Sequence, residues 1–213
     1  MHNVMTQDKD DRKRPQLRLV VNNPELRGSR PATGEDASMP FEVLIAKRHE
    51  LRADFYTGIA PQHVKAYERI ERHLERRGWL YGLDPQHGRL MVIPAATVCP
   101  EVLEHGGSPQ DELLLFVADD PTGLGLCLCL EMILPFWSDD AVMEEALIYA
   151  PIYPYGSLFL EENKNDGYLD LIYRLSFPLY PPAPTERLLE KLFAVARYEL
   201  RETLIGLDEF PEA

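Results

Sequence analysis

Between residues 169 and 177 the chain places a large apolar side chain at every second position. This period of two is that of a β-strand with one buried face, because a helix would spread the same residues around its circumference. Residues 124–132 have the same period, so the chain must build a sheet and cover at least one face of it. The alternating residues are Leu169, Leu171, Tyr173, Leu175 and Phe177 in the first segment and Leu124, Leu126, Leu128, Leu130 and Met132 in the second.

Shorter apolar segments predict further strands. Residues 79–83 and 89–93 flank a turn-forming sequence that contains Asp, Pro and Gly, which is typical of a hairpin. Residues 112–118 form a strongly apolar strand, and residues 158–160 form a short one that follows Gly156.

Four segments have helical periodicity. The first begins at a Ser38 cap and ends at Gly58, and the second runs from Pro61 to Gly78. A third helix follows Ser138, and a long final helix, capped by Thr185, has an apolar stripe wide enough for burial on more than one side.

Taken in chain order, these elements predict an α+β fold, with an antiparallel sheet flanked by helices in the order α-βββ(β)-α-ββ-α. A chain of 213 residues that is 45% hydrophobic supports one sizeable core and an extension. We predict a flexible arm at residues 1–37, a helical extension at 38–60, the main domain at 61–205 and a tail at 206–213.

The arm mixes charges and prolines and has too little apolar surface to offset its ordering entropy, so we expect it to be partly disordered. One stretch differs, since Leu17, Leu19 and Val21 alternate as in a strand. This possible strand, residues 17–21, would add to an exposed sheet edge of the same or a neighbouring subunit. The alternative is an apolar stretch within a loose tail.

The formal charge is −13, and residues 1–40 hold seven Lys/Arg against six Asp/Glu, so the excess acid lies beyond the arm. A strongly negative body disfavours nucleic acid and anionic membranes as partners. No run approaches the roughly 18 apolar residues that cross a bilayer, and the first residues lack an apolar signal region. We therefore predict a cytoplasmic location.

The cysteines, Cys99, Cys127 and Cys129, form an odd and sparse set, which indicates reduced thiols rather than a disulfide framework. With His87 or His105 they would make a zinc site if the fold brought them together. The paired C-x-x-C spacing of such sites is absent from the sequence, and small buried cysteines are common in strands, so we predict no metal site.

No other pattern meets the requirements of catalysis. Paired acids such as Asp119-Asp120 and Asp139-Asp140 are typical of turns and helix starts. The sequence contains neither a Walker motif nor G-x-S-x-G. We predict no catalytic residue and no cofactor, and expect that the protein is not an enzyme.

The second half of the chain, through residues 146–149, 155–160 and 167–175, is similar to the YbjN-like proteins. That group resembles the type III secretion chaperones of the CesT type in fold. In both, a helix is followed by a Gly-led strand, a hairpin, an alternating strand and a C-terminal amphipathic helix. The resemblance covers about residues 61–205 and implies a non-catalytic, commonly dimeric domain that binds an extended polypeptide or a partner surface.

Our leading hypothesis is a chaperone-like or adaptor domain that binds another protein or, as a homodimer, itself. Two alternatives are a metal- or small-molecule-binding enzyme and a structural or regulatory subunit of an assembly. One flank of the last helix is a candidate binding surface, and Phe136 and Trp137 are candidates too, unless they form the core or a hydrophobic staple at the helix start. The predicted partner-binding residues are Phe136, Trp137, Leu17, Leu19 and Val21.

Overall fold

A computed structural model of the protein describes residues 39–120, 122–123, 125–136, 140–149, 153–162 and 169–208. Within them the strands form one antiparallel sheet in the order β1-β2-β3-β4-β6-β5, so that β1 and β5 are its edges. In the part of the chain described, no helix is long and apolar enough to cross a membrane. The strands are β1 (Gly82–Asp84), β2 (Leu90–Pro94), β3 (Glu112–Asp119), β4 (Leu126–Ile133), β5 (Gly156–Glu162) and β6 (Leu169–Leu179).

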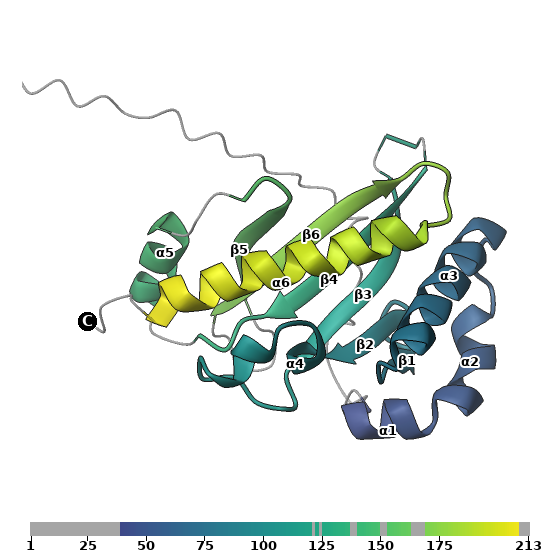
Figure 1. The fold of residues 1–213 in the computed structure, drawn as a ribbon, viewed down its shortest axis with the longest axis horizontal. Helices are drawn as coiled ribbons and strands as arrows, with labels where there is room; N and C mark the ends of the chain where they lie inside the picture. The colour runs from purple at the N-terminus through teal and green to yellow at the C-terminus, as the bar shows by residue number, and fades with distance from the viewer. Residues whose placement is uncertain are drawn as a thin grey trace, which may run out of the picture.

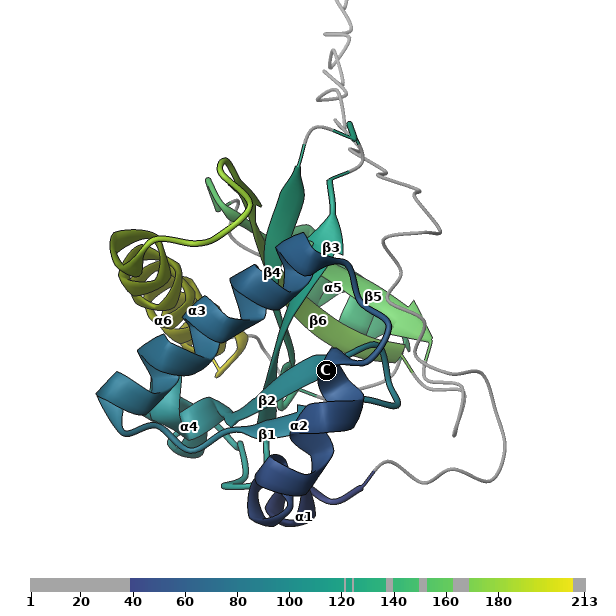
Figure 2. The same ribbon diagram turned by 90° about the vertical axis from the view of Figure 1, so that its right-hand side faces the viewer.

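Two long helices, α3 (Pro61–Arg77) and α6 (Glu186–Asp208), lie on the same side of the sheet (Figures 1 and 2). We call the side that they cover the inner face and the opposite side the outer face. Apart from Leu169, which is half-buried, the described alternating residues of β4 and β6 point inward and join the helices in one apolar core, which confirms the predicted strand periods. Leu124 lies outside those residues.

The helical segment predicted from Ser38 is two helices, α1 (Phe41–Ala46) and α2 (Arg48–Tyr56), separated by Lys47. The first residue of α1 follows Pro40, whereas Ser38 lies outside the described residues. The break changes the direction of the chain, so that the two helices pack differently. Phe41 and Leu44 of α1 cluster with Val92 on the outer face, whereas Phe55 of α2 reaches the main core.

The other helices begin and end largely where the sequence predicts. Gly78 ends α3 in the left-handed conformation at φ 66°, and the Thr185 hydroxyl accepts a hydrogen bond from the Leu188 N–H at 3.2 Å. The third predicted helix is α5 (Asp140–Tyr149), and its proposed Ser138 cap lies outside the described residues. The connection after β2 contains α4 (Ala95–Val98) and a 3₁₀ turn (Pro100–Leu103) that the sequence did not predict, since each is only four residues long.

A polar contact joins the first turn of α6 to α3. His73 is fully buried and stacks on Phe193, and its Nδ1 lies 2.6 Å from a carboxylate oxygen of Glu186. Arg76 pairs with the other oxygen. The hydrogen bond with His73 is the main reason that the pKa of Glu186 is lowered from its ordinary value of 4.5.

The low pKa of Glu186 predicts a contribution to acid unfolding. Above pH 4.5 this carboxylate stabilises the fold, and the stabilisation is lost as the pH falls through its lower folded-state pKa, because the unfolded chain then binds the proton more readily. In Glu186→Gln, we expect the thermal midpoint to fall less steeply with acidification below that pH. Equal slopes in the two proteins would contradict this prediction.

Candidate functional site

The outer face of the sheet has an apolar strip beyond the part that α1 covers. Register pairs place Phe116 beside Cys129 and Ile133 beside Ile172. Phe116 and Ile172 are buried at 8% and 3% exposure although neither belongs to the main core or to the α1 cluster, while Ile133 is 37% exposed. The strip therefore has a buried floor and a more exposed rim.

A shallow groove of about 70 Å³ follows this strip across the sheet from β2 to β5. Its size is well below the roughly 300–1,000 Å³ of small-molecule sites, so the groove is too small to enclose such a ligand. We call it the outer-face groove. Its lining residues are His87, Gly88, Leu90, Leu114, Phe116, Glu131, Met132, Ile133, Glu161, Ile172 and Arg174.

An ion pair lies in the outer-face groove among these apolar residues. Arg174 Nε contacts Glu131 Oε2 at 2.5 Å, with the two side chains 30% and 17% exposed. The same guanidinium lies 4.7 Å over the ring of Phe159. Glu161 adds a second carboxylate to the lining. Because Arg174 offsets Glu131, the lining is apolar in the middle and carries one net negative charge, that of Glu161, when His87 is neutral.

The predicted partner-binding residues are not part of the outer-face groove as described. Phe136 is half-buried and packs against the main core, and its role in partner binding stays a prediction. Trp137, Leu17, Leu19 and Val21 lie outside the described residues, so their roles stay predictions.

The cysteines are divided between the two sides of the sheet. Cys99 belongs to the main core and lies 4.0 Å from the backbone carbonyl of Arg197, whereas Cys127 and Cys129 lie on the outer face. Among the residues that the structure describes, no group of three or more His, Cys, Asp and Glu side chains could hold a metal ion. The zinc alternative needs Cys99 together with Cys127 and Cys129, and the sheet lies between Cys99 and the other two.

The thiols should differ in reactivity, because the thiolate is the reacting species. Burial raises the pKa of Cys99 to about 12 and that of Cys129 to about 11. Cys127 is only half-buried, and burial raises its pKa less. We expect maleimide to modify Cys127 first in the native protein, as measured by mass spectrometry of peptides. Faster modification of Cys99 would contradict the packing described here.

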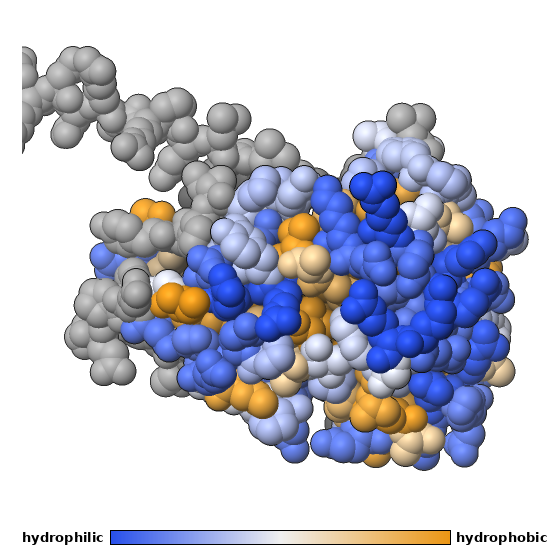
Figure 3. All heavy atoms as spheres, in the orientation of Figure 1, coloured by the Kyte–Doolittle hydropathy of each residue, from blue (hydrophilic) through white to orange (hydrophobic). Residues whose placement is uncertain are grey.

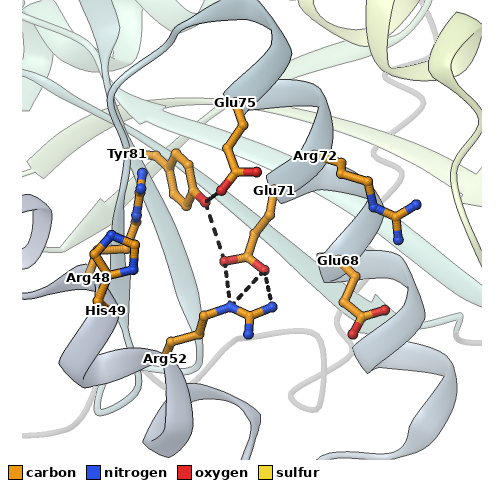
Figure 4. A pocket seen from close by; sticks show the side chains of 8 residues that line it. All are labelled: Arg48, His49, Arg52, Glu68, Glu71, Arg72, Glu75 and Tyr81. Carbon is orange, nitrogen blue, oxygen red and sulfur yellow. Dashed lines mark hydrogen bonds and ion pairs between the residues drawn. The ribbon is translucent and has the colours of Figure 1, made fainter.

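A second concave site is a charged cleft of about 400 Å³ between α2 and α3 (Figure 4). Glu71 lies at its base with 5% of its surface exposed. Its carboxylate accepts hydrogen bonds from Arg52 at 3.1 Å and from the Tyr56 hydroxyl at 2.6 Å. The cleft is lined by Arg48, His49, Arg52, Glu68, Glu71, Arg72, Glu75 and Tyr81.

The formal charges of the arginines and glutamates in this cleft balance, and Arg52 and Glu71 form an ion pair. Three arginines face three glutamates, and Arg48 stacks 4.3 Å over the ring of Tyr81. Burial and the hydrogen bond to Glu71 raise the pKa of Tyr56, so this hydroxyl acts as a donor. The arrangement joins α2 to α3. Over these helices the helix-covered side of the molecule is mostly hydrophilic (Figure 3).

Comparison with known proteins gives a distant likeness. No family model matches the chain, and no curated protein matches it. A solved structure, that of YbjN from E. coli, described as a candidate transcription regulator, aligns with a TM-score of 0.39 and 10% identity. The alignment covers 65% of this chain and 88% of that one. A similarity this weak carries no inference about function.

Proposed function

We propose that this protein is a non-catalytic binding domain, chaperone-like or adaptor, that holds an extended segment of a partner protein across the outer-face groove. The observation that carries the proposal is the groove itself, an apolar strip with acidic side chains on a sheet face away from α3 and α6. The homodimer implied by the resemblance to secretion chaperones remains a prediction.

The dimensions of the sheet favour an extended segment as the occupant. The groove crosses the four strand intervals from β2 to β5, which is about 19 Å at ~4.8 Å per interval. Six residues of extended chain, at ~3.3 Å each, fill that length. Such a segment runs across the strands and cannot join their hydrogen-bond ladder, so its side chains must supply the contacts. Apolar residues at alternate positions, with a basic residue nearby, fit an apolar groove in which Arg174 offsets Glu131 and Glu161 leaves one net negative charge.

The test compares two isoleucines of nearly equal exposure. Ile133 is 37% exposed on the outer face, whereas Ile205 is 38% exposed on α6. We expect Ile133→Asp to weaken capture of the native partner at least tenfold, about 1.4 kcal/mol, because it puts a desolvated charge in an apolar contact. Ile205→Asp should capture the partner like the wild-type protein. Capture is measured by quantitative mass spectrometry after cross-linking in cells.

Folding must be checked in both variants by circular dichroism and thermal midpoint. If the folded Ile133→Asp variant keeps its partners, or if Ile205→Asp loses the same ones, the outer-face groove is not the binding site.

The charged cleft supports a second candidate, small-molecule binding, because its volume of about 400 Å³ falls in the range of such sites. It ranks second because its lining is charged, whereas small-molecule sites are mostly apolar. A metabolite that raises the thermal midpoint of the wild-type protein but not that of Arg72→Ala would establish this function.

A further inference from the structure

We propose that residues 17–21 of the same chain occupy the outer-face groove when no partner is bound, so that a partner segment must displace them. This inference rests on the proposed function in that both use the same groove. It differs from addition of a strand at a sheet edge, since the segment would lie across the strands.

The position of Met39 provides the first argument. Met39 packs against the cluster of Phe41, Leu44 and Val92, and Leu90 and Leu114 pack against the same cluster. Leu90 and Leu114 also line the outer-face groove. The first described residue of the chain therefore lies beside the end of the groove that is nearest to β2.

The tether is long enough to reach every part of the groove. Seventeen residues lie between Val21 and Met39, so the eighteen steps from one to the other span about 60 Å of extended chain, against about 19 Å for the whole groove. A tether of this kind also gives the segment an effective concentration of about a millimolar. Even weak contacts would then keep the groove occupied for most of the time.

The segment matches the groove in length and in the pattern of its side chains. Five extended residues span about 17 Å. Leu17, Leu19 and Val21 then point to one side, where Ile133 is the exposed apolar side chain of the strip and Phe116 and Ile172 form its buried floor. Arg18 and Val20 would point to the opposite side, away from this floor.

Charge favours the same placement. From Arg12 to Pro24 the sequence holds four basic residues and no acid. Residues 1–40 carry a net +1, which leaves −14 for the rest of the chain. The lining of the groove carries one net negative charge, because Arg174 offsets Glu131 and leaves Glu161. Attraction between the segment and the acidic body would therefore add to the apolar contacts.

Thiol alkylation in the full chain tests the proposal. Cysteine is placed at Ile133 or, as the matched control, at Ile205, in a Cys127→Ser background, and modification by maleimide is timed at each position. The segment is then changed by Leu17→Ser, Leu19→Ser and Val21→Ser together, which keeps its charge. We expect this change to accelerate modification of Ile133→Cys about tenfold and to leave the modification rate of Ile205→Cys unchanged. Tenfold is the factor for a groove that is covered roughly nine-tenths of the time.

Equal rates for Ile133→Cys with and without the three substitutions would overturn the proposal, as would equal acceleration at both positions. Protection that weakens on serial dilution would show that a second copy covers the groove, which also overturns it. The proposed function is tested separately, because it fails when Ile133→Asp keeps its partners. Alkylation rates therefore test occupation of the groove by residues 17–21, and partner capture tests binding of a partner there.

Discussion

Gly156→Ala is expected to destabilise the fold by about 3 kcal/mol, because the added methyl group meets buried atoms that already hold a hydrogen-bond network. A Cβ at this position would lie 2.3 Å from Glu199 Oε2 and 2.6 Å from Cε2 of Tyr173. Glu199 is 1% exposed, and its carboxylate accepts hydrogen bonds from the Tyr173 hydroxyl at 2.7 Å and from the backbone N–H groups of Tyr155 and Gly156. Moving the carboxylate away would leave several buried donors unsatisfied.

A glycine on α6 provides the control. A Cβ at Gly206 has no neighbour within 4 Å, and the residue lies inside a helix, so Gly206→Ala should stabilise the protein by roughly 0.5–1 kcal/mol. Urea denaturation measures both variants. If Gly156→Ala is as stable as the wild-type protein, the Glu199 carboxylate does not form these hydrogen bonds to the start of β5.

The fold could be predicted to this extent because β4 and β6 place a large apolar residue at every second position. Their inward residues form the main core with α3 and α6, which are amphipathic over many turns. Such long periodic patterns determine the element type in the absence of any tertiary information. Short elements give no such signal, and α4 and the 3₁₀ turn after it were missed for that reason.

The outer-face groove was missed although two signals were present in the sequence. Ile172 interrupts the polar positions of β6 at Asp170, Arg174 and Ser176, and residues 113–118 are apolar at every position, which indicates a strand that is apolar on both faces. Which residues of neighbouring strands stand side by side depends on register, however, and the sequence does not give the register.

The buried carboxylate of the charged cleft had a signal as well. Glu71 lies at a helical interval from Tyr67 and Leu74, both on the buried side of α3. A charged residue at such a position predicts a polar partner, here Arg52, but the partner comes from another helix and cannot be identified from spacing alone.

Tyr67→Phe should cost about 2–4 kcal/mol through the loss of a single oxygen atom. The recorded pairing of β2 with β3 ends at Met91 and Leu115. Beyond that pair, the Tyr67 hydroxyl accepts a hydrogen bond from the Val117 N–H at 3.0 Å and donates one to the Arg89 carbonyl at 2.9 Å. The hydroxyl therefore links Arg89, just before β2, to Val117 of β3, where the backbone hydrogen bonds between the two strands have stopped.

The expected cost is large because the hydroxyl serves two backbone groups, and Tyr67 itself is only 2% exposed, so water cannot readily replace it. Tyr198, 58% exposed on α6, is the control, and Tyr198→Phe should leave the free energy of unfolding unchanged. In hydrogen exchange, the Val117 amide of Tyr67→Phe should exchange faster than in the wild-type protein. The amides paired between β4 and β6 should lose only as much protection from exchange as the lower free energy of unfolding requires. If Tyr67→Phe is as stable as Tyr198→Phe, water must reach Val117, and the junction of α3 with the sheet is looser than its packing indicates.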